Sequence, residues 1–164
     1  MKFSPVNVNF FNLIKLPLAY FGGVRVKSIS DNEVVVKIKH RWINQNPFKS
    51  MFWAAQGMAA ELPTGLLVMK AIKDSKRKVS MLVTHQEAHF FKKATGVIHF
   101  SCKGGNQIRD AIATSIKTGE GQTILLVSEG VNEQGVIVSR FQFEWSLKVK
   151  SMKLEVESLK VQNI

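Results

Sequence analysis

The sequence predicts an α+β fold in which an antiparallel sheet wraps around one long central helix. Two strands are predicted before an apolar helical segment over residues 51–70, and four strands are predicted after it. Strands on both sides of a single long helix are typical of α+β proteins with an antiparallel sheet. The helix is apolar on nearly every side, so it must be covered on every side, and a curved sheet can do this. The 164 residues suit one domain with a single core.

The first residues, 1–22, are predicted to form a leading helix that belongs to the fold. Apolar residues recur at near-helical spacing over residues 10–16, and Pro17 and then Gly22 follow as stop signals. Polar residues interrupt the apolar run that a signal peptide would need. Two strands are then expected, over residues 24–27 and 34–39.

A polar loop over residues 44–47 leads into the central helix. Ser50 is placed to cap a helix that begins near Met51 and runs to about Lys70. Pro63 lies inside this segment, where it removes a backbone donor and its ring clashes with the preceding turn. A kink or a break at Pro63 is therefore predicted.

The second half of the chain is predicted to add the remaining strands, with one insertion among them. The apolar spacing over residues 108–116 fits a short helix or a strand bulge, and we favour the helix. Residues 151–164 alternate weakly and fit either a tail or an added edge strand, so the domain is expected to span residues 1–150. The strands are expected over residues 79–90, 95–103, 122–129 and 136–150.

Charge and cysteine content narrow the class of protein. The formal net charge is +11, but the basic residues are spread along the chain, without zinc-finger spacing or an aromatic RNA-binding signature. A solvated basic surface or a phosphorylated small-molecule partner is therefore favoured over nucleic acid. The single cysteine, Cys102, excludes an internal disulfide framework and favours a reducing, cytoplasmic location. No uncharged apolar run reaches the roughly 18 residues that a membrane span requires.

One ionisable residue, Glu61, stands in the middle of the central apolar helix. It shares one helical face with apolar and small residues at steps of three and four, namely Met51, Ala54, Met58, Gly65, Val68 and Ile72. The opposite face is also largely apolar. Burial would raise the pKa of Glu61 towards the range of a general base. We therefore expect Glu61 to serve a pocket, the alternative being a rim carboxylate that reaches water or a lysine.

The sequence gives weaker indications of a metal site, and none of a serine nucleophile or a phosphate-binding loop. His85, Glu87 and His89 lie at alternate positions of a predicted strand, and His99 follows on the next, but no set of partners at zinc-site spacing accompanies them. Neither a nucleophile elbow nor a glycine-rich phosphate loop is present. The sequence therefore predicts no metal and no cofactor.

The segment around Glu61 resembles the hotdog-fold acyl-CoA thioesterases, in which a sheet wraps one central helix. The residues that carry the resemblance are Asn46-Pro47, Ser50, Ala59-Ala60-Glu61 and Gly65. The Phe141-x-Phe143-x-Trp145 strand is also similar to an uncharacterised bacterial branch described as a thioesterase-like domain of unknown function. The resemblance implies an acyl-CoA or other acyl thioester as substrate. It also implies a homodimer or a tetramer with the site at a subunit interface.

The resemblance further implies roles for individual residues. Glu61 would act as base or nucleophile, Asn46 would place water or substrate, and the backbone N–H of Trp53 would polarise the thioester carbonyl. The relatives usually have His-Gly-Gly where this chain has Phe52-Trp53-Ala54. Glycine lets a substrate approach closely and tryptophan does not, so a non-catalytic acyl-binding module is the second hypothesis.

Further residues are candidate substrate contacts. Ser50 fits a helix cap or a substrate contact, and Gln56 either hydrogen-bonds a ligand or faces solvent. On charge alone, four basic residues are candidates for the phosphates of coenzyme A. They are Lys76, Arg77, Lys92 and Lys93.

Overall fold

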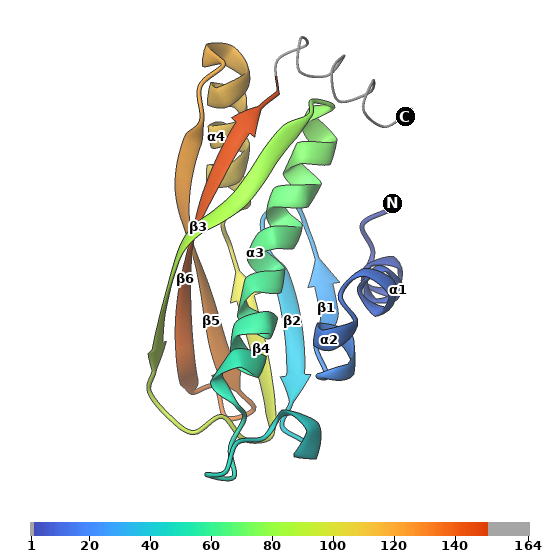
Figure 1. Cartoon of the computed structure of the whole chain (residues 1–164), viewed down its shortest axis with the longest axis vertical. Coiled ribbons are helices and arrows are strands. Elements are labelled where there is room, and N and C mark those ends of the chain that lie inside the picture. Colours follow the sequence, from blue (N-terminus) through green and yellow to red (C-terminus); the bar gives the residue numbers. More distant parts are fainter. Residues whose placement is uncertain (1, 151–164) are drawn as a thin grey trace, which may run out of the picture.

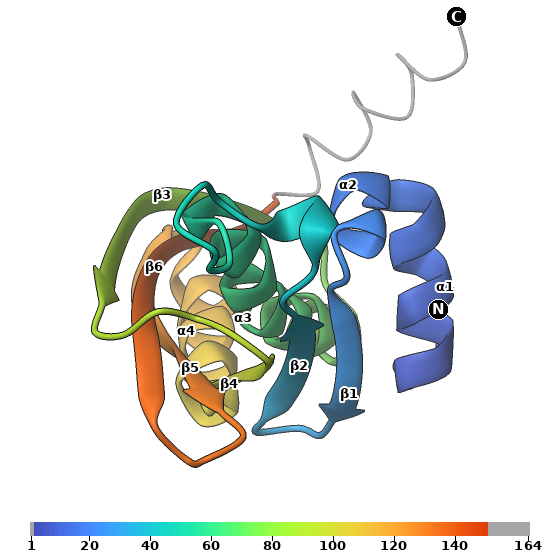
Figure 2. The ribbon, with the colours of Figure 1, turned by 90° about the horizontal axis from the view of Figure 1, so that it is seen from below.

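The structure is a computed structural model that describes residues 2–150. A six-stranded antiparallel sheet curves around the long helix α3 (Figures 1 and 2), which confirms the predicted α+β class. The prediction for residues 151–164 lies outside the described residues. The helices are α1 (Pro5–Lys15), α2 (Pro17–Phe21), α3 (Trp53–Ser75) and α4 (Gly105–Thr118). The strands are β1 (Arg25–Ile29), β2 (Val34–Lys39), β3 (Val79–Phe90), β4 (Val97–Cys102), β5 (Gln122–Asn132) and β6 (Ile137–Val149).

The strand order in the sheet is β1-β2-β4-β5-β6-β3. Strand β3 follows α3 in the chain but pairs with the last strand, β6, along its whole length. The two edges of the sheet are therefore β1 and β3. Helix α3 packs against the inner face of the sheet, and α4 packs against α3 and the ends of β5 and β6.

Alternating side chains of the strands form one core with the buried residues of α3. The rings of Phe100 and Phe141 meet edge to face, with centroids 5.9 Å apart. The Trp145 indole N–H donates to Thr64 Oγ1 on α3 at 3.1 Å, so the one polar group of this ring is satisfied inside the core. This bond also fixes the register between α3 and β6.

The leading segment, predicted as one helix within residues 1–22, forms two helices, α1 and α2. Ser4 caps α1 through the Asn7 N–H, and Pro17 begins α2 instead of ending the helical region. Proline is well suited to a first helical position because its missing N–H has no partner there in any helix. The side chain of Asn9 then pairs with the free edge of β1, accepting from Val26 N at 2.8 Å and donating to Val26 O at 3.0 Å.

Helix α3 differs from its prediction at Pro63 and at both ends, since it runs to Ser75 and not to about Lys70. It begins at Trp53, and its N-cap is Phe52, which supplies no side-chain cap, so the cap predicted at Ser50 is wrong. Of the kink or break predicted at Pro63, the break is wrong, because α3 runs through Pro63 as one helix. Pro63 is buried by the surrounding sheet, and packing on several sides of α3 holds the helix together at this residue.

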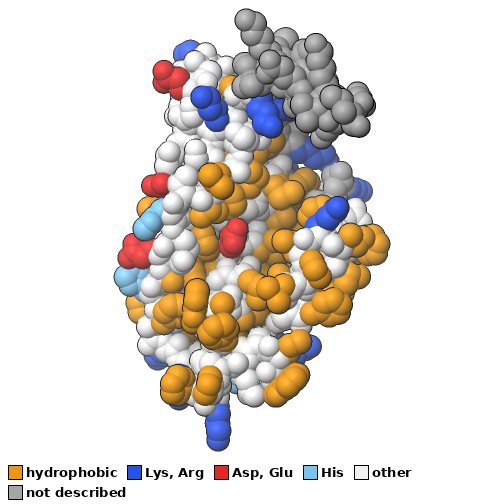
Figure 3. Space-filling view, in the orientation of Figure 1, with side chains coloured by type: hydrophobic (Ala, Val, Ile, Leu, Met, Phe, Trp, Pro, Cys, Tyr) orange, Lys and Arg blue, Asp and Glu red, His pale blue; other side chains and the backbone are white. Residues whose placement is uncertain are grey.

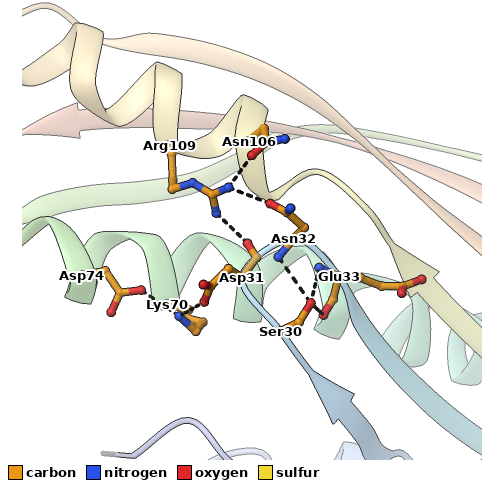
Figure 4. A network of polar contacts seen from close by, with 8 residues as sticks. All are labelled: Ser30, Asp31, Asn32, Glu33, Lys70, Asp74, Asn106 and Arg109. Atoms are coloured by element: carbon orange, nitrogen blue, oxygen red, sulfur yellow. Dashed lines mark hydrogen bonds and ion pairs between the residues drawn. The ribbon is translucent and has the colours of Figure 1, made fainter.

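The turn between β1 and β2 ties α3 to α4 (Figure 4). Lys70 on α3 contacts the Asp31 carboxylate at 2.5 Å and that of Asp74 at 2.8 Å. Arg109 on α4 donates to Asp31 O at 2.7 Å and to Asn32 Oδ1 at 2.6 Å. The turn therefore adds polar contacts to two helices that also pack against each other. Within residues 2–150, no helix is long and apolar enough to cross a membrane.

Candidate functional site

A largely apolar groove lies between α3 and the N-terminal helices α1 and α2. It encloses about 460 Å³, and its base is formed by Met81 of β3 and Trp145 of β6. Figure 3 shows hydrophobic side chains over this face of the molecule, with an isolated acidic side chain among them. The other residues that line the groove are Phe11, Asn12, Lys15, Leu16, Pro17, Leu18, Ala19, Met58, Glu61, Leu62, Gly65, Leu66 and Met69.

Glu61 contributes the one carboxylate among the groove residues. Its side chain remains open to solvent in the single chain and has no hydrogen bond or ion pair to any residue within 2–150. The surrounding apolar walls desolvate the carboxylate and raise its pKa above the ordinary value. An unpaired carboxylate with a raised pKa can accept a proton from water near neutral pH.

Asn12 is a second polar residue of this groove, and the sequence analysis did not identify it. Only 1% of its surface is exposed, and neither Oδ1 nor Nδ2 has a partner within the described residues. A buried amide without partners is unfavourable unless something else satisfies it. The amide therefore offers the N–H donors of Nδ2 and the acceptor Oδ1 to a molecule that occupies the groove.

A separate pocket of about 430 Å³ lies at the start of α3. It brings together six of the predicted site residues, and apolar residues of the neighbouring loops complete it. The predicted residues in this pocket are Asn46, Ser50, Trp53, Gln56, Lys92 and Lys93.

Asn46 shapes the loop that leads into α3. Its Oδ1 accepts from the N–H groups of Phe48 at 2.9 Å and of Ser50 at 3.2 Å, and its Nδ2 donates to Ser50 Oγ at 3.1 Å. Both ends of the amide are thus used inside the turn. Ser50, which was expected to cap α3, contacts Asn46 instead.

Gln56 and Trp53 differ in how they face the pocket. Gln56 is 4% exposed; its Nε2 donates to Met51 O at 3.3 Å, while its Oε1 has no partner within residues 2–150. Trp53 is 56% exposed, and its ring meets that of Phe52 edge to face at 5.8 Å. The Trp53 ring is not among the residues that line the Glu61 groove.

The single chain does not bring Glu61 to the start of α3. Glu61 lies eight positions after Trp53 on the helix, a rise of about 12 Å. The four basic residues predicted to contact the phosphates of coenzyme A lie near opposite ends of α3. Lys76 and Arg77 follow the far end of α3, whose 23 residues span about 34 Å, whereas Lys92 and Lys93 line the pocket at its start.

The histidines form no site with metal-binding character in the described part of the chain. His89 Nε2 contacts Glu87 Oε1 at 2.7 Å on the exposed strand β3. Across residues 2–150, no three histidine, cysteine or carboxylate side chains lie close enough to hold a metal ion together.

Comparison with known proteins identifies the family. Residues 8–147 match the family described as a domain of unknown function, DUF4442. The chain belongs to the DUF4442 family. No curated protein matches the sequence.

Solved structures that are similar to this DUF4442 protein share its fold. A Pseudomonas aeruginosa protein of unknown function, described as a probable thioesterase, is 21% identical, with 90% of this chain and 97% of that chain covered and a TM-score of 0.77. A Chlorobaculum tepidum protein of unknown function is 15% identical, with coverages of 90% and 98% and a TM-score of 0.75. A Haemophilus influenzae thioesterase is 10% identical, with coverages of 91% and 93% and a TM-score of 0.70. The DUF4442 chain therefore has the hotdog fold, with α3 as its central helix.

Proposed function

We propose that this protein hydrolyses an acyl thioester, with an acyl-CoA as the substrate class and Glu61 as the base or nucleophile. The observation that carries the proposal is the unpaired Glu61 carboxylate in an otherwise apolar groove. The thioesterase-like fold of the similar structures supports the reaction class.

As a base, Glu61 would take a proton from water while the water oxygen attacks the thioester carbonyl carbon. The tetrahedral oxyanion would then collapse with cleavage of the C–S bond, and the leaving thiolate would take up the proton. As a nucleophile, the carboxylate would attack the carbonyl carbon itself, and the C–S bond would break with release of the thiolate to give an anhydride. Water would then hydrolyse the anhydride to the free acid and return the Glu61 carboxylate. A raised pKa favours the base, because proton transfer is most efficient when the pKa lies near the working pH.

The walls of the groove fit the acyl chain of such a substrate. Leu16, Leu18, Met58, Leu62 and Met69 offer apolar surface on both sides of Glu61. Burial of an acyl chain there would contribute about 0.8 kcal/mol for each CH₂ group. The amide of Asn12 would then meet the polar end of the acyl group or the attacking water.

The geometry of α3 supports a site shared by two subunits. The first N–H groups of α3 have no side-chain cap and are free to stabilise an oxyanion. They lie about 12 Å from Glu61 along the same helix, too far for both to act on one carbonyl. We therefore propose a homodimer in which Glu61 of one protomer acts beside Asn46 and Trp53 of its partner.

The outer edge of β3 is a suitable surface for this partner. Within the described residues β3 pairs on one side only, with β6, and it is 12 residues long. A long unpaired edge is a template for pairing with another chain. The exposed rings of Phe52, Trp53 and Phe90 add apolar surface at the same end of the molecule, where a second copy would cover them.

The alternative is an acyl-binding module without catalysis, which the bulky side chains of Phe52 and Trp53 favour. A ring that fills the position of the carbonyl would prevent the reaction. In the single chain, however, the Trp53 ring lies outside the Glu61 groove, and this supports the enzyme.

The test is a panel of acyl-CoA substrates assayed by release of free thiol. The wild type should turn over at least one chain length, and Glu61→Gln should lose about 10²–10⁴-fold in kcat/KM. Thermal unfolding should confirm that Glu61→Gln is folded. Saturable binding of acyl-CoA without turnover would support the binding module, and full activity of Glu61→Gln would contradict the role of Glu61.

A second assay tests the shared site. Co-refolded Glu61→Ala and Asn46→Ala subunits should form heterodimers with one intact site and recover part of the activity. Light scattering reports whether dimers form. A monomer at micromolar concentration, or inactive heterodimers, would contradict the shared site.

A further inference from the structure

Five cationic side chains gather on the outer face of the sheet, opposite α3. Neighbouring residues of β1, β2 and β4 point inward and are buried in the core, among them Val26, Val36 and Ile98. Side chains alternate between the two faces of a strand, so the basic residues lie on the outer face. They are Arg25, Lys27, Lys37, Lys39 and Arg41, which we call the basic pocket residues.

The sheet register places these charges side by side. Arg25 is the cross-strand partner of Lys37, and Lys37 is in turn the partner of His99 on β4. Like charges directly opposite each other destabilise a sheet. None of the basic pocket residues forms an ion pair with a carboxylate of residues 2–150. The arrangement therefore lowers stability in the absence of an anion.

The surface between these side chains is concave. A pocket of about 390 Å³ is lined by the basic pocket residues together with Gly23, Val97 and His99. No acidic residue lines the pocket, and at its margin Glu133 Oε2 accepts from Val97 N at 3.4 Å. Burial, followed by the charges of Lys27 and Lys37, lowers the pKa of His99. His99 is thus neutral near pH 7 and can accept or donate one hydrogen bond.

Arg25 is held in place before any ligand binds. Its guanidinium lies over the Tyr20 ring, 3.5 Å from the centroid, and its Nη1 donates to Val24 O at 2.8 Å and to Tyr20 O. The remaining N–H groups keep their donor capacity. A guanidinium fixed in this way loses little conformational entropy when it binds a phosphate oxygen.

We propose that the basic pocket binds a small ligand that carries a diphosphate group, either inorganic pyrophosphate or the diphosphate of a nucleotide. Five cations around one hollow match several closely spaced negative charges, and Arg and Lys are the side chains that bind phosphate oxygens. The lining contains no Phe, Tyr or Trp ring on which the bases of a nucleic acid strand could stack. This inference does not depend on the proposed thioesterase activity.

The experiment is a calorimetric titration of the whole chain with pyrophosphate, ADP and coenzyme A at constant ionic strength. Lys37→Glu is the test variant, because Lys37 lies between Arg25 and His99 in the register. Lys117→Glu is the matched control, since it makes the same change in net charge at an exposed position of α4. We expect saturable binding, weakened about tenfold or more by Lys37→Glu and left nearly unchanged by Lys117→Glu.

Urea unfolding of each variant shows whether a loss of binding results from a loss of stability. Lys37→Glu should be at least as stable as the wild type, because it removes a like-charge contact with Arg25. Tighter binding of ADP or coenzyme A than of pyrophosphate would identify a nucleotide as the source of the diphosphate, and equal binding would identify pyrophosphate alone. The proposal is overturned by absence of saturation, by equal weakening in both variants, or by tighter binding of an oligonucleotide than of any of the three probes.

Discussion

Replacing Asn12 by leucine should stabilise the folded protein, contrary to the usual effect of a core substitution. The Asn12 side chain is buried, and both of its polar atoms lack partners within the described residues. Each unsatisfied group costs about 1–3 kcal/mol of desolvation. Leucine has a similar size and no polar atom, so Asn12→Leu should raise the free energy of unfolding by about 2–6 kcal/mol, the sum for the two polar atoms. The midpoint of thermal unfolding should rise by about 2–4 °C for each kcal/mol.

Asn9 provides a matched control one turn away on the same helix. Its amide makes two hydrogen bonds to the backbone of Val26. Asn9→Leu would leave the Val26 N–H and C=O without these partners and should lower the free energy of unfolding by about 1–3 kcal/mol. Urea unfolding of the two variants should therefore give opposite signs. If Asn12→Leu is destabilised as much as Asn9→Leu, the Asn12 amide is bonded in the folded state and the reasoning is wrong.

Three other predictions follow from single features. The pKa of Glu61 is raised in the folded state, so the contribution of Glu61 to stability is complete below its pKa in the unfolded chain and is lost as pH rises through its pKa in the folded protein. Urea unfolding should therefore show a free energy of unfolding that falls over this pH range in the wild type and not in Glu61→Gln. Gly105→Ala should destabilise the protein by several kcal/mol, on the order of an overpacked core site, since the new Cβ would clash with Asp31 O and lie 2.6 Å from Asn32 Cα; a normal urea midpoint would contradict this. Burial raises the pKa of the Cys102 thiol to about 11, so iodoacetamide should label Cys102 at neutral pH only after unfolding, and fast labelling of the native protein would refute its burial.

The sequence predicted the elements whose patterns are strong and local. The bounds of β3, Val79–Phe90, were predicted to the residue, because the alternating pattern of the strand is strong and begins directly after the basic run that ends at Lys78. The extent of α3 was less certain, since Ser50 has the side chain of a cap but is drawn into the turn of Asn46. Pro17 was taken as a stop, although proline also begins helices, and the choice depends on the packing of α2 against α3.

The candidate site was predictable only in part, for a similar reason. Glu61 stands out in the sequence because every neighbour on its helical face is apolar or small, and its place in a groove was expected. Asn12 does not stand out, because whether a buried amide has partners depends on the whole fold. The lysines of β1 and β2 look like scattered charge in the sequence, and only the register places Arg25 beside Lys37.

The contact between Asn9 and the first strand has a consequence for how many copies can associate through the sheet. A sheet with two free edges can add neighbours at both ends and grow without limit into a fibre. Here the Asn9 amide occupies the hydrogen-bonding groups of Val26, and α1 lies along that edge (Figure 2), which leaves β3 as the one edge open to pairing within residues 2–150. If the homodimer proposed above forms through β3, the covered edge at β1 would not allow further copies to pair with the sheet. Loss of Asn9 would therefore lower solubility as well as stability, because the freed edge of β1 could then pair with another copy of the chain.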